Sequence, residues 1–600
     1  MRRFAVVVFA GIFFLPWFGR LSPAVAQSNS STPVDSAPAT SPSVTNPSAS
    51  PSTPSTKSAA NTTAAKRKPV AATSARKKHK TISPRVRRVR QAFVASASLR
   101  PMAQQLLQDR TPVAYAGVEA YARRHAKGDA DAGALAWLVI GYARTLDHDY
   151  AKAIDPLNRS KPGASELGDY VAYYLGEAYL NTAHNAEALS TLADFSKNFP
   201  DSLLIRDAHV VYASALLEEG RPQEAAALLE KDRAPVRSDL EFITGRAYEA
   251  AGDNQKAESA FRNVYFNLPN SIEADAAGRE LRKLGISGSV AERRTRADLL
   301  LKARRYSDAA HDYHDLVDEV SPAERPQVQL ALAGALEKSD HSRDGRQILT
   351  SMGVQTGDAE AERLYLLSET ERSTSDEDAV QRTLNELRQF GPASPWLEQA
   401  LLSAANMYLL KRDYDRAIDF FRELQQRFPN DARASYAHWK ASWLAFRQGR
   451  TDEARREFDQ QIALYPDSPE IPNALYWRAR IAEEDGNPAM ARAFYQKLSD
   501  RFRNYYYAEL GRQRLKTLPD AAASSKEAAP KEPPPRYALL DHVSPLSTAG
   551  KITAVDPPDD NLRVARARLL SNGGLADMAV RELQAAASQE GCLLYTSRCV

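Results

Sequence analysis

Apolar residues recur along most of this chain at the spacing of one helical turn, and the pattern repeats at a fixed interval. In "DYDRAIDFFRELQQRFPND", Ala417 is followed four residues later by Phe421, so both lie on one face of a predicted helix. The same small residue returns every 37 residues at Ala417, Ala454 and Ala491. Upstream, Ala225 follows Ala188 by 37 residues, and Ala188 and Ala257 each stand 12 residues before a proline, as Ala417 does. This periodicity predicts helical repeats.

Prolines and glycines mark the predicted ends of these helices. A proline stops the first helix of each unit, because it lacks an amide donor and disfavours helix in the residue before it, as at Pro200, Pro269, Pro429 and Pro466. The next helix closes on a glycine, as at Gly252, Gly449 and Gly486. Each unit is therefore an α-hairpin, and such hairpins bury their apolar faces by stacking on one another. We expect an all-α superhelical array, U-shaped or ring-like, of about ten hairpins over residues 93–515.

The hairpin pattern resembles the tetratricopeptide repeat. The units are longer than that class's common repeat, and an aromatic residue or leucine precedes the proline in "RFPN", "LYPD", "NFPD" and "NLPN". These features are similar to the longer repeats of bacterial envelope proteins.

The N-terminal segment has the features of an export signal. Arg2 and Arg3 precede an apolar run, and the small residues Ala24 and Ala26 follow it. We expect a signal peptide over residues 1–26, cleaved after Ala26, and a periplasmic location. A transmembrane anchor is the alternative, although the run is short for a membrane span. The cleavage site is followed by Gln27 rather than cysteine, so a lipoprotein is not expected.

Residues 27–92 are predicted to be disordered, because a Ser/Pro/Thr-rich stretch buries too little apolar surface to offset its ordering entropy. Residues 66–90 hold eleven Lys or Arg and no acid. The chain's formal net charge is only +4, so the remainder is net acidic. The basic arm could contact an anionic envelope surface or serve as a soluble spacer. Export argues against nucleic acid as a partner.

No catalytic motif is present in the sequence. Metalloprotease, nucleophile-elbow, phosphate-loop and paired-cysteine patterns are all absent, so we assign no catalytic, cofactor-binding or metal residues and expect no cofactor. His311 and His314 share a helical face and could hold a metal with a nearby aspartate, but a solvated surface is the simpler interpretation. Cys592 and Cys599 lie in a tail, residues 592–600, that we expect to be non-native or truncated.

Aromatic residues near the end of the array are the remaining candidates for a binding site. Tyr505, Tyr506 and Tyr507 could stack on sugar rings, or they could seal the last hairpin against its neighbour. Packing is the simpler interpretation for them. It is also the simpler one for Trp439, Trp443 and Trp477, which we expect in the core between hairpins.

After the array, residues 516–560 read as a Pro-rich linker and residues 561–591 as one further hairpin, "RARLLSNGGLADMAVREL". With the terminal "YYYAELGRQRL", this order resembles the soluble lytic murein transglycosylase family. The resemblance implies a superhelical scaffold that positions peptidoglycan glycan strands for cleavage between N-acetylmuramic acid and N-acetylglucosamine. That family's lysozyme-like catalytic domain would lie beyond this chain, so we expect no activity from the chain alone.

The alternative is a non-catalytic periplasmic repeat adaptor. Such a protein would bind envelope proteins, as outer-membrane assembly factors and division coordinators do, and would need no catalytic domain. A polysaccharide-export scaffold is a more remote alternative.

Overall fold

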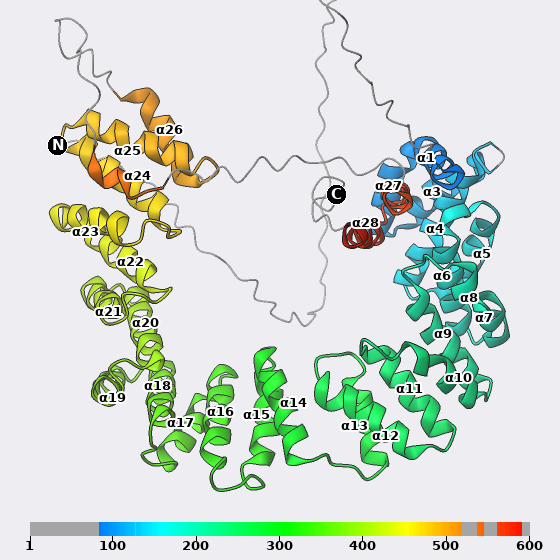
Figure 1. The fold of residues 1–600 in the computed structure, drawn as a ribbon, viewed down its shortest axis with the longest axis horizontal. Coiled ribbons are helices and arrows are strands. Elements are labelled where there is room, and N and C mark those ends of the chain that lie inside the picture. The colour runs from blue at the N-terminus through cyan, green and yellow to red at the C-terminus, as the bar shows by residue number, and fades with distance from the viewer. Residues whose placement is uncertain (1–82, 127, 519–536, 545–560, 591–600) are drawn as a thin grey trace, which may run out of the picture. The chain divides into compact units, whose positions relative to one another are not determined.

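The computed structural model describes residues 83–126, 128–518, 537–544 and 561–590, which all belong to one unit. In these residues the chain forms helices and no strand, which confirms the all-α fold class (Figure 1). Three helices come first: α1 (Pro84–Ala95), α2 (Arg100–Asp109) and α3 (Pro112–His125). An array of hairpins comes after them.

The sequence repeat begins at the helix that a proline stops, whereas the hairpins of the structure are counted from the other helix. That helix is called the A helix of a hairpin, and the helix that follows it is called the B helix. The A helices are α4 (Ala130–Leu146), α6 (Gly168–Asn181), α9 (Ile205–Glu218), α11 (Ser238–Ala250), α14 (Val290–Lys302), α16 (Arg325–Lys338), α18 (Asp358–Ser373), α20 (Pro395–Leu410), α22 (Ala434–Arg447), α24 (Ile471–Glu484) and α26 (Tyr506–Thr517). The B helices are α5 (Tyr150–Ser160), α7 (Asn185–Leu192), α10 (Pro222–Leu229), α12 (Asn254–Arg262), α15 (Tyr306–Leu316), α17 (Ser342–Ser351), α19 (Glu377–Phe390), α21 (Tyr414–Arg427), α23 (Thr451–Leu464) and α25 (Pro488–Arg501). The short helices α8 (Phe195–Asn198) and α13 (Ala274–Lys283) lie between hairpins, and α26 has no B helix after it in the described residues.

The predicted stop signals lie between helices, as expected. Pro200, Pro269, Pro429 and Pro466 all occupy turns. The glycines that close A helices have positive φ, at +81° for Gly252, +79° for Gly449 and +70° for Gly486. Glycine suits these positions because it has no Cβ to clash in the left-handed region.

Each A helix that has a B helix after it packs closely against that helix. The repeat alanines Ala188, Ala257 and Ala417 are fully buried, as are the large residues one turn after Ala257 and Ala417, which are Phe261 and Phe421. Glycines on the A helices allow this approach: a Cβ added at Gly245 would lie 2.5 Å from the ring of Phe261. The pattern of small and large residues read from the sequence is therefore the contact surface of the hairpin.

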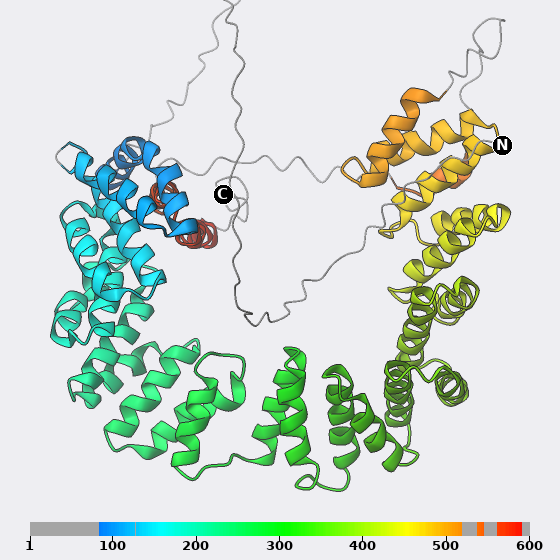
Figure 2. The same cartoon turned by 180° about the vertical axis from the view of Figure 1, so that it is seen from behind.

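Neighbouring A helices also pack side by side in parts of the array. α4 contacts α6, α6 contacts α9, and α9 contacts α11; α16 contacts α18, and α18 contacts α20; and α24 contacts α26. We call the surface that the A helices present the A face. Figure 2 shows the same succession of hairpins from behind.

Two predicted boundaries are wrong. The segment predicted to be disordered up to residue 92 ends earlier, because α1 begins at Pro84, with Ser83 capping it through its hydroxyl. Val86, Val89 and Ala92 are buried in the same core as the last two helices, α27 (Leu562–Asn572) and α28 (Ala576–Glu590). The local sequence around α1 could not show that these distant helices cover it.

The predicted linker of residues 516–560 also contains structure. Residues 537–544 include a short 3₁₀ helix, Ala538–Asp541, and Val543 is 1% exposed in the core of α23 to α26.

Several predictions fall outside the described residues. These are the signal peptide with its cleavage after Ala26, the Ser/Pro/Thr-rich segment up to residue 82, and the tail from Cys592. Among the helices in the described part of the chain, none has both the length and the apolar character needed to cross a membrane.

The close contact at Gly245 gives a stability prediction. Gly245→Ala should destabilise the array, because overpacking against the rigid ring of Phe261 costs about 1 to 3 kcal/mol, against a gain of about 1 kcal/mol in helix propensity. Gly117→Ala in α3 is the matched control: its Cβ would meet nothing within 4 Å, so it should stabilise by about 0.5 to 1 kcal/mol. Urea denaturation measures the free energy of unfolding of both variants. Hydrogen exchange across α11 and α12 shows whether the effect of Gly245→Ala is local. Equal stabilisation by the two substitutions would contradict this packing.

Candidate functional site

The hairpin of α27 and α28 docks on the N-terminal end of the A face, about 400 residues earlier in sequence. α27 packs along α1 and touches α2. In both ribbon views the hairpin lies beside these N-terminal helices (Figure 1, Figure 2). The turn of the hairpin also fits tightly: a Cβ at Gly573 would lie 3.0 Å from Leu135, and a Cβ at Gly574, whose φ is +68°, 3.1 Å from the amide nitrogen of Gln104.

A buried network of charges holds the hairpin against α6. Arg566 on α27 places its Nη2 atom 2.7 Å from Oδ2 of Asp169 and 3.0 Å from Oε1 of Glu582. All three side chains are at most 5% exposed. Burial alone would lower the pKa of Arg566, but the two carboxylates outweigh it and raise that pKa. The guanidinium therefore stays charged.

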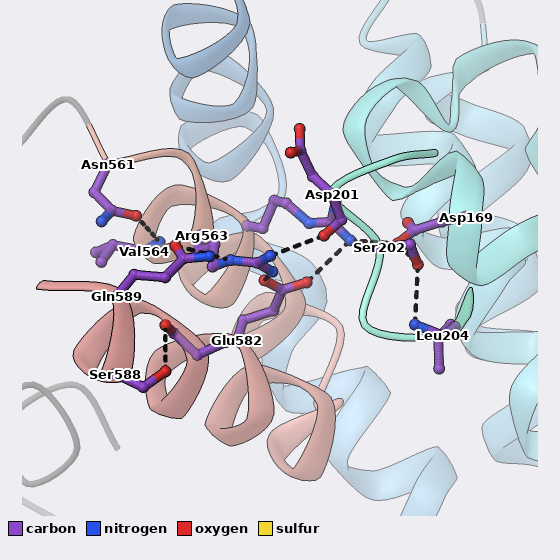
Figure 3. Close-up of polar contacts among 12 residues, drawn as sticks. Asp169, Asp201, Ser202, Leu204, Asn561, Arg563, Val564, Glu582, Ser588 and Gln589 are labelled. Atoms are coloured by element: carbon purple, nitrogen blue, oxygen red, sulfur yellow. Dashed lines mark hydrogen bonds and ion pairs between the residues drawn. The ribbon is translucent and has the colours of Figure 1, made fainter. Parts of the chain in front are cut away.

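Further hydrogen bonds extend this network (Figure 3). The hydroxyl of Ser202 donates to Asp169 at 2.7 Å, and the hydroxyl of Tyr170 donates to Glu582 at 3.1 Å. Arg563 reaches Glu582 at 3.0 Å and donates to the carbonyl oxygen of Asp201 at 2.9 Å. At the other end of α27, the side-chain amide of Asn572 donates to the carbonyl oxygen of Phe93 at 2.7 Å. The docked position is thus specified by polar contacts along the whole of α27.

A row of aromatic side chains runs across the A face at α22, α24 and α26. Trp439, Trp443 and Phe446 succeed one another on α22 at spacings of four and three residues, so they share a helical face. The row continues through Trp443 and Trp477 with ring centroids 4.5 Å apart, Tyr476 and Tyr507 at 5.0 Å, and Tyr507 and Tyr506 at 5.4 Å. We call this set the aromatic row.

The aromatic row changes from core to surface along its length. Trp439 is only 7% exposed, Trp443 and Trp477 are half-buried, and Tyr506 is 71% exposed. Burial raises the pKa of Tyr476 and of Tyr507, so both hydroxyls stay neutral. Beside the row, Arg514 donates from Nε to Glu483 at 3.1 Å, so this arginine is already paired. The row therefore offers mostly uncharged rings, with an exposed tyrosine at one end.

The three tyrosines singled out in the sequence have different positions. Tyr507 packs on Tyr476 and Trp477, as the packing interpretation predicts. Tyr505 is 49% exposed and contacts Phe502, and Tyr506 is exposed. Trp443 and Trp477, expected in the core, are half-buried and line the surface with Tyr507.

His311 and His314 have exposed side chains on α15, each within 4 Å of a carboxylate oxygen of Asp315. With His341 they line an open cleft of about 600 Å³ over α15, α16 and α17. In the described part of the chain, no group of three or more His, Cys, Asp or Glu side chains is placed to hold a metal ion.

Sequence reasoning missed the docking residues Arg566, Glu582 and Asp169. Their partners are far apart in sequence, so no local pattern joins them. One signal was present: arginine and glutamate stand on the apolar stripes of "RVARARLLSNGGLADMAVREL", where charged residues are buried only if they are paired.

Comparison with known families identifies the repeat class in parts of the chain. A tetratricopeptide-repeat family matches residues 173–238 and 440–506, and a second tetratricopeptide-repeat family matches residues 399–431. Both matched families describe repeats, and neither describes a transglycosylase. The resemblance to the tetratricopeptide repeat is thus confirmed.

A curated relative matches a smaller part. Outer membrane protein assembly factor BamD of Neisseria meningitidis serogroup B is 26% identical over 149 residues, which are 22% of this chain and 56% of that protein. This chain thus spans about half the length of the relative. Similar solved structures include the tetratricopeptide domain of P58(IPK), at 18% identity, TM-score 0.20 and coverage of 60% of this chain and 99% of that one. Human IFIT1 matches at 14% identity, TM-score 0.25 and coverage of 70% and 90%. Such low scores support no statement about function.

The docked hairpin gives a second prediction. Arg566→Ala should weaken docking by about 3 to 5 kcal/mol, because it leaves the carboxylate of Asp169 buried without a cation and leaves Glu582 paired with Arg563 alone. Hydrogen exchange in residues 561–590 should then rise selectively. Arg568→Ala, on the same helix and with no side-chain partner among the described residues, is the control and should change exchange little. Unchanged exchange in Arg566→Ala would show that the network does not hold the hairpin.

Proposed function

We propose that this chain, whose matched segments are tetratricopeptide repeats, is a non-catalytic adaptor that binds other proteins of the cell envelope. The observation that carries the proposal is the aromatic row, which leaves Tyr506 exposed and Trp443 and Trp477 half-buried on the A face. Large aromatic side chains of this kind anchor protein partners, because they bury much apolar area at little cost in conformational entropy.

Two other findings support the envelope as the place of action. The partial similarity to an outer membrane protein assembly factor favours an adaptor over an enzyme. The basic and apolar start of the chain, with small residues at Ala24 and Ala26, favours export to the periplasm. A role in assembling envelope proteins fits both, with no chemical step performed by this chain.

A second candidate is the scaffold region of a periplasmic peptidoglycan lytic transglycosylase. The supporting observation is again the aromatic row, because planar rings such as the exposed Tyr506 also stack on the apolar faces of sugars. In that case the bound partner would be a murein glycan strand. The two candidates predict chemically different adducts at one position.

Crosslinking at Tyr506 tests both candidates. A photoreactive phenylalanine analogue replacing Tyr506 in cells should give protein adducts, identified by mass spectrometry. The same analogue at Phe390, an exposed aromatic on the B helix α19, is the matched control and should give few. Muropeptide adducts at position 506 would favour the transglycosylase scaffold, and equal adducts at both positions would refute a binding role for the aromatic row.

Loss of the aromatic row should reduce the same interaction. Trp443→Ala combined with Trp477→Ala should lower the yield of the position-506 adduct at least about tenfold, since anchor residues each contribute about 2 kcal/mol or more. Leu410→Ala, which removes an 84% exposed side chain from the neighbouring A helix α20, should leave the yield unchanged. Circular dichroism of both variants checks that the array remains folded.

A further inference from the structure

Three tyrosines and a glutamate gather on the A face beside the docked hairpin. Tyr142 comes from α4, and Tyr173, Tyr174 and Glu177 come from α6. The ring centroids of Tyr142 and Tyr174 are 5.0 Å apart, as are those of Tyr173 and Tyr174. Glu177 comes four residues after Tyr173 and three after Tyr174, so it lies on the same helical face. We call these four residues the tyrosine–glutamate site.

The polar atoms of this site lack partners. Among the residues that the structure describes, no Lys, Arg or His pairs with the carboxylate of Glu177, and the three tyrosine hydroxyls form no hydrogen bond. By contrast, the nearby Asp207 on α9 is paired with cations, because it lies 2.6 Å from Arg237 and 3.6 Å from Arg581 of α28. A half-buried carboxylate without a cation is an unfavourable arrangement unless a ligand supplies one.

The surroundings of the site disfavour the charged form of Glu177 and, among the described residues, supply no cation to offset this. Burial, with a smaller contribution from Asp207, raises the pKa of Glu177 to about 7. Charged and titratable groups from the packed elements surround the site. They are Tyr142 on α4; Tyr150 on α5; Tyr170, Tyr173 and Tyr174 on α6; Asp207 on α9; Arg237 just before α11 and Asp239 on it; and Asp577 and Arg581 on α28. The two arginines are already paired with Asp207, and Arg237 also with Asp239. No cation of the described chain is left to neutralise Glu177.

This chemistry matches a cationic side chain. An ammonium or guanidinium group donates hydrogen bonds to a carboxylate and to hydroxyl oxygens, and it is attracted to the faces of aromatic rings. We propose that the tyrosine–glutamate site binds a lysine or arginine side chain of a partner polypeptide. A polypeptide is favoured over a small amine because a second carboxylate, Asp577 on the docked hairpin, acts on Tyr142 and offers a place for a further cation of the same partner.

The proposal goes beyond the adaptor function and shares no residue with the aromatic row. Binding requires the ionised carboxylate of Glu177. Lysine side chains stay protonated across the neutral range, so affinity should rise as pH rises through about 7. Protonation of Glu177 at lower pH removes the charge that attracts the ligand, and affinity falls.

Fluorescence anisotropy with fluorescein-labelled hexalysine tests the site on the intact chain. Glu177→Gln should weaken binding at pH 8 at least about tenfold and remove the dependence of affinity on pH between 6 and 8. Glu187→Gln, which makes the same charge change on the exposed face of α7, should stay within about twofold of the unchanged protein. Tyr174→Leu should also weaken binding, since it removes a ring of the site.

Three outcomes would overturn the proposal. These are equal hexalysine affinity in Glu177→Gln and Glu187→Gln, a pH dependence that survives Glu177→Gln, or cadaverine binding as tightly as hexalysine. Glu177→Gln should fold, because it removes an unpaired charge, and a thermal midpoint at pH 8 no lower than that of the unchanged protein verifies this. Trp443→Ala with Trp477→Ala should leave hexalysine binding intact, which separates failure of this site from failure of the adaptor proposal.

Discussion

Every hairpin in this chain depends on the close approach of an A helix to its B helix. Glycine and alanine on one helix, such as Gly245, receive a large side chain from the other, such as Phe261. A single hairpin still leaves apolar surface open, so each unit needs a neighbour. The same need explains the role of the segments after the array: Val543 joins the core of the last hairpins, and α27 joins the core of the first helices. Segments that read as linker and as an extra hairpin thereby cover surface that the array itself cannot cover.

The regular part of the fold could be predicted because its interactions are local. Ala417 and Phe421 lie one turn apart, Pro429 stops their helix, and Gly449 closes the next one, so a short window holds all the information for a hairpin. The start of α1 at Pro84 could not be predicted in this way. Val86 and Val89 stand among arginines, and their burial depends on a core that includes helices near the other end of the sequence.

The candidate sites likewise combine residues that the sequence indicates with residues that only the structure reveals. Tyr505, Tyr506 and Tyr507 were visible as a run, but only the structure separates the packed Tyr507 from the exposed Tyr506 and joins them to Trp477 on another hairpin. Glu177 carried no signal at all, because acids are common and nothing in one sequence shows which lacks a counter-ion. Whether residues far apart in sequence form an ion pair or a hydrogen bond can be decided only from the three-dimensional structure.

The buried ion pairs at the docked hairpin determine where the hairpin docks more than how tightly it docks. Replacing a buried ion pair by apolar residues is often neutral or stabilising, whereas separating its members is costly. Another register of α27 on the A face would leave Arg566 or Glu582 buried without a partner, so the network selects one position. That position places Asp577 and Arg581 of α28 beside Tyr142 and Asp207. Because Arg581 pairs with Asp207 rather than with Glu177, the docked hairpin leaves one carboxylate of the A face uncompensated. A cation from another molecule is the complement that this geometry lacks.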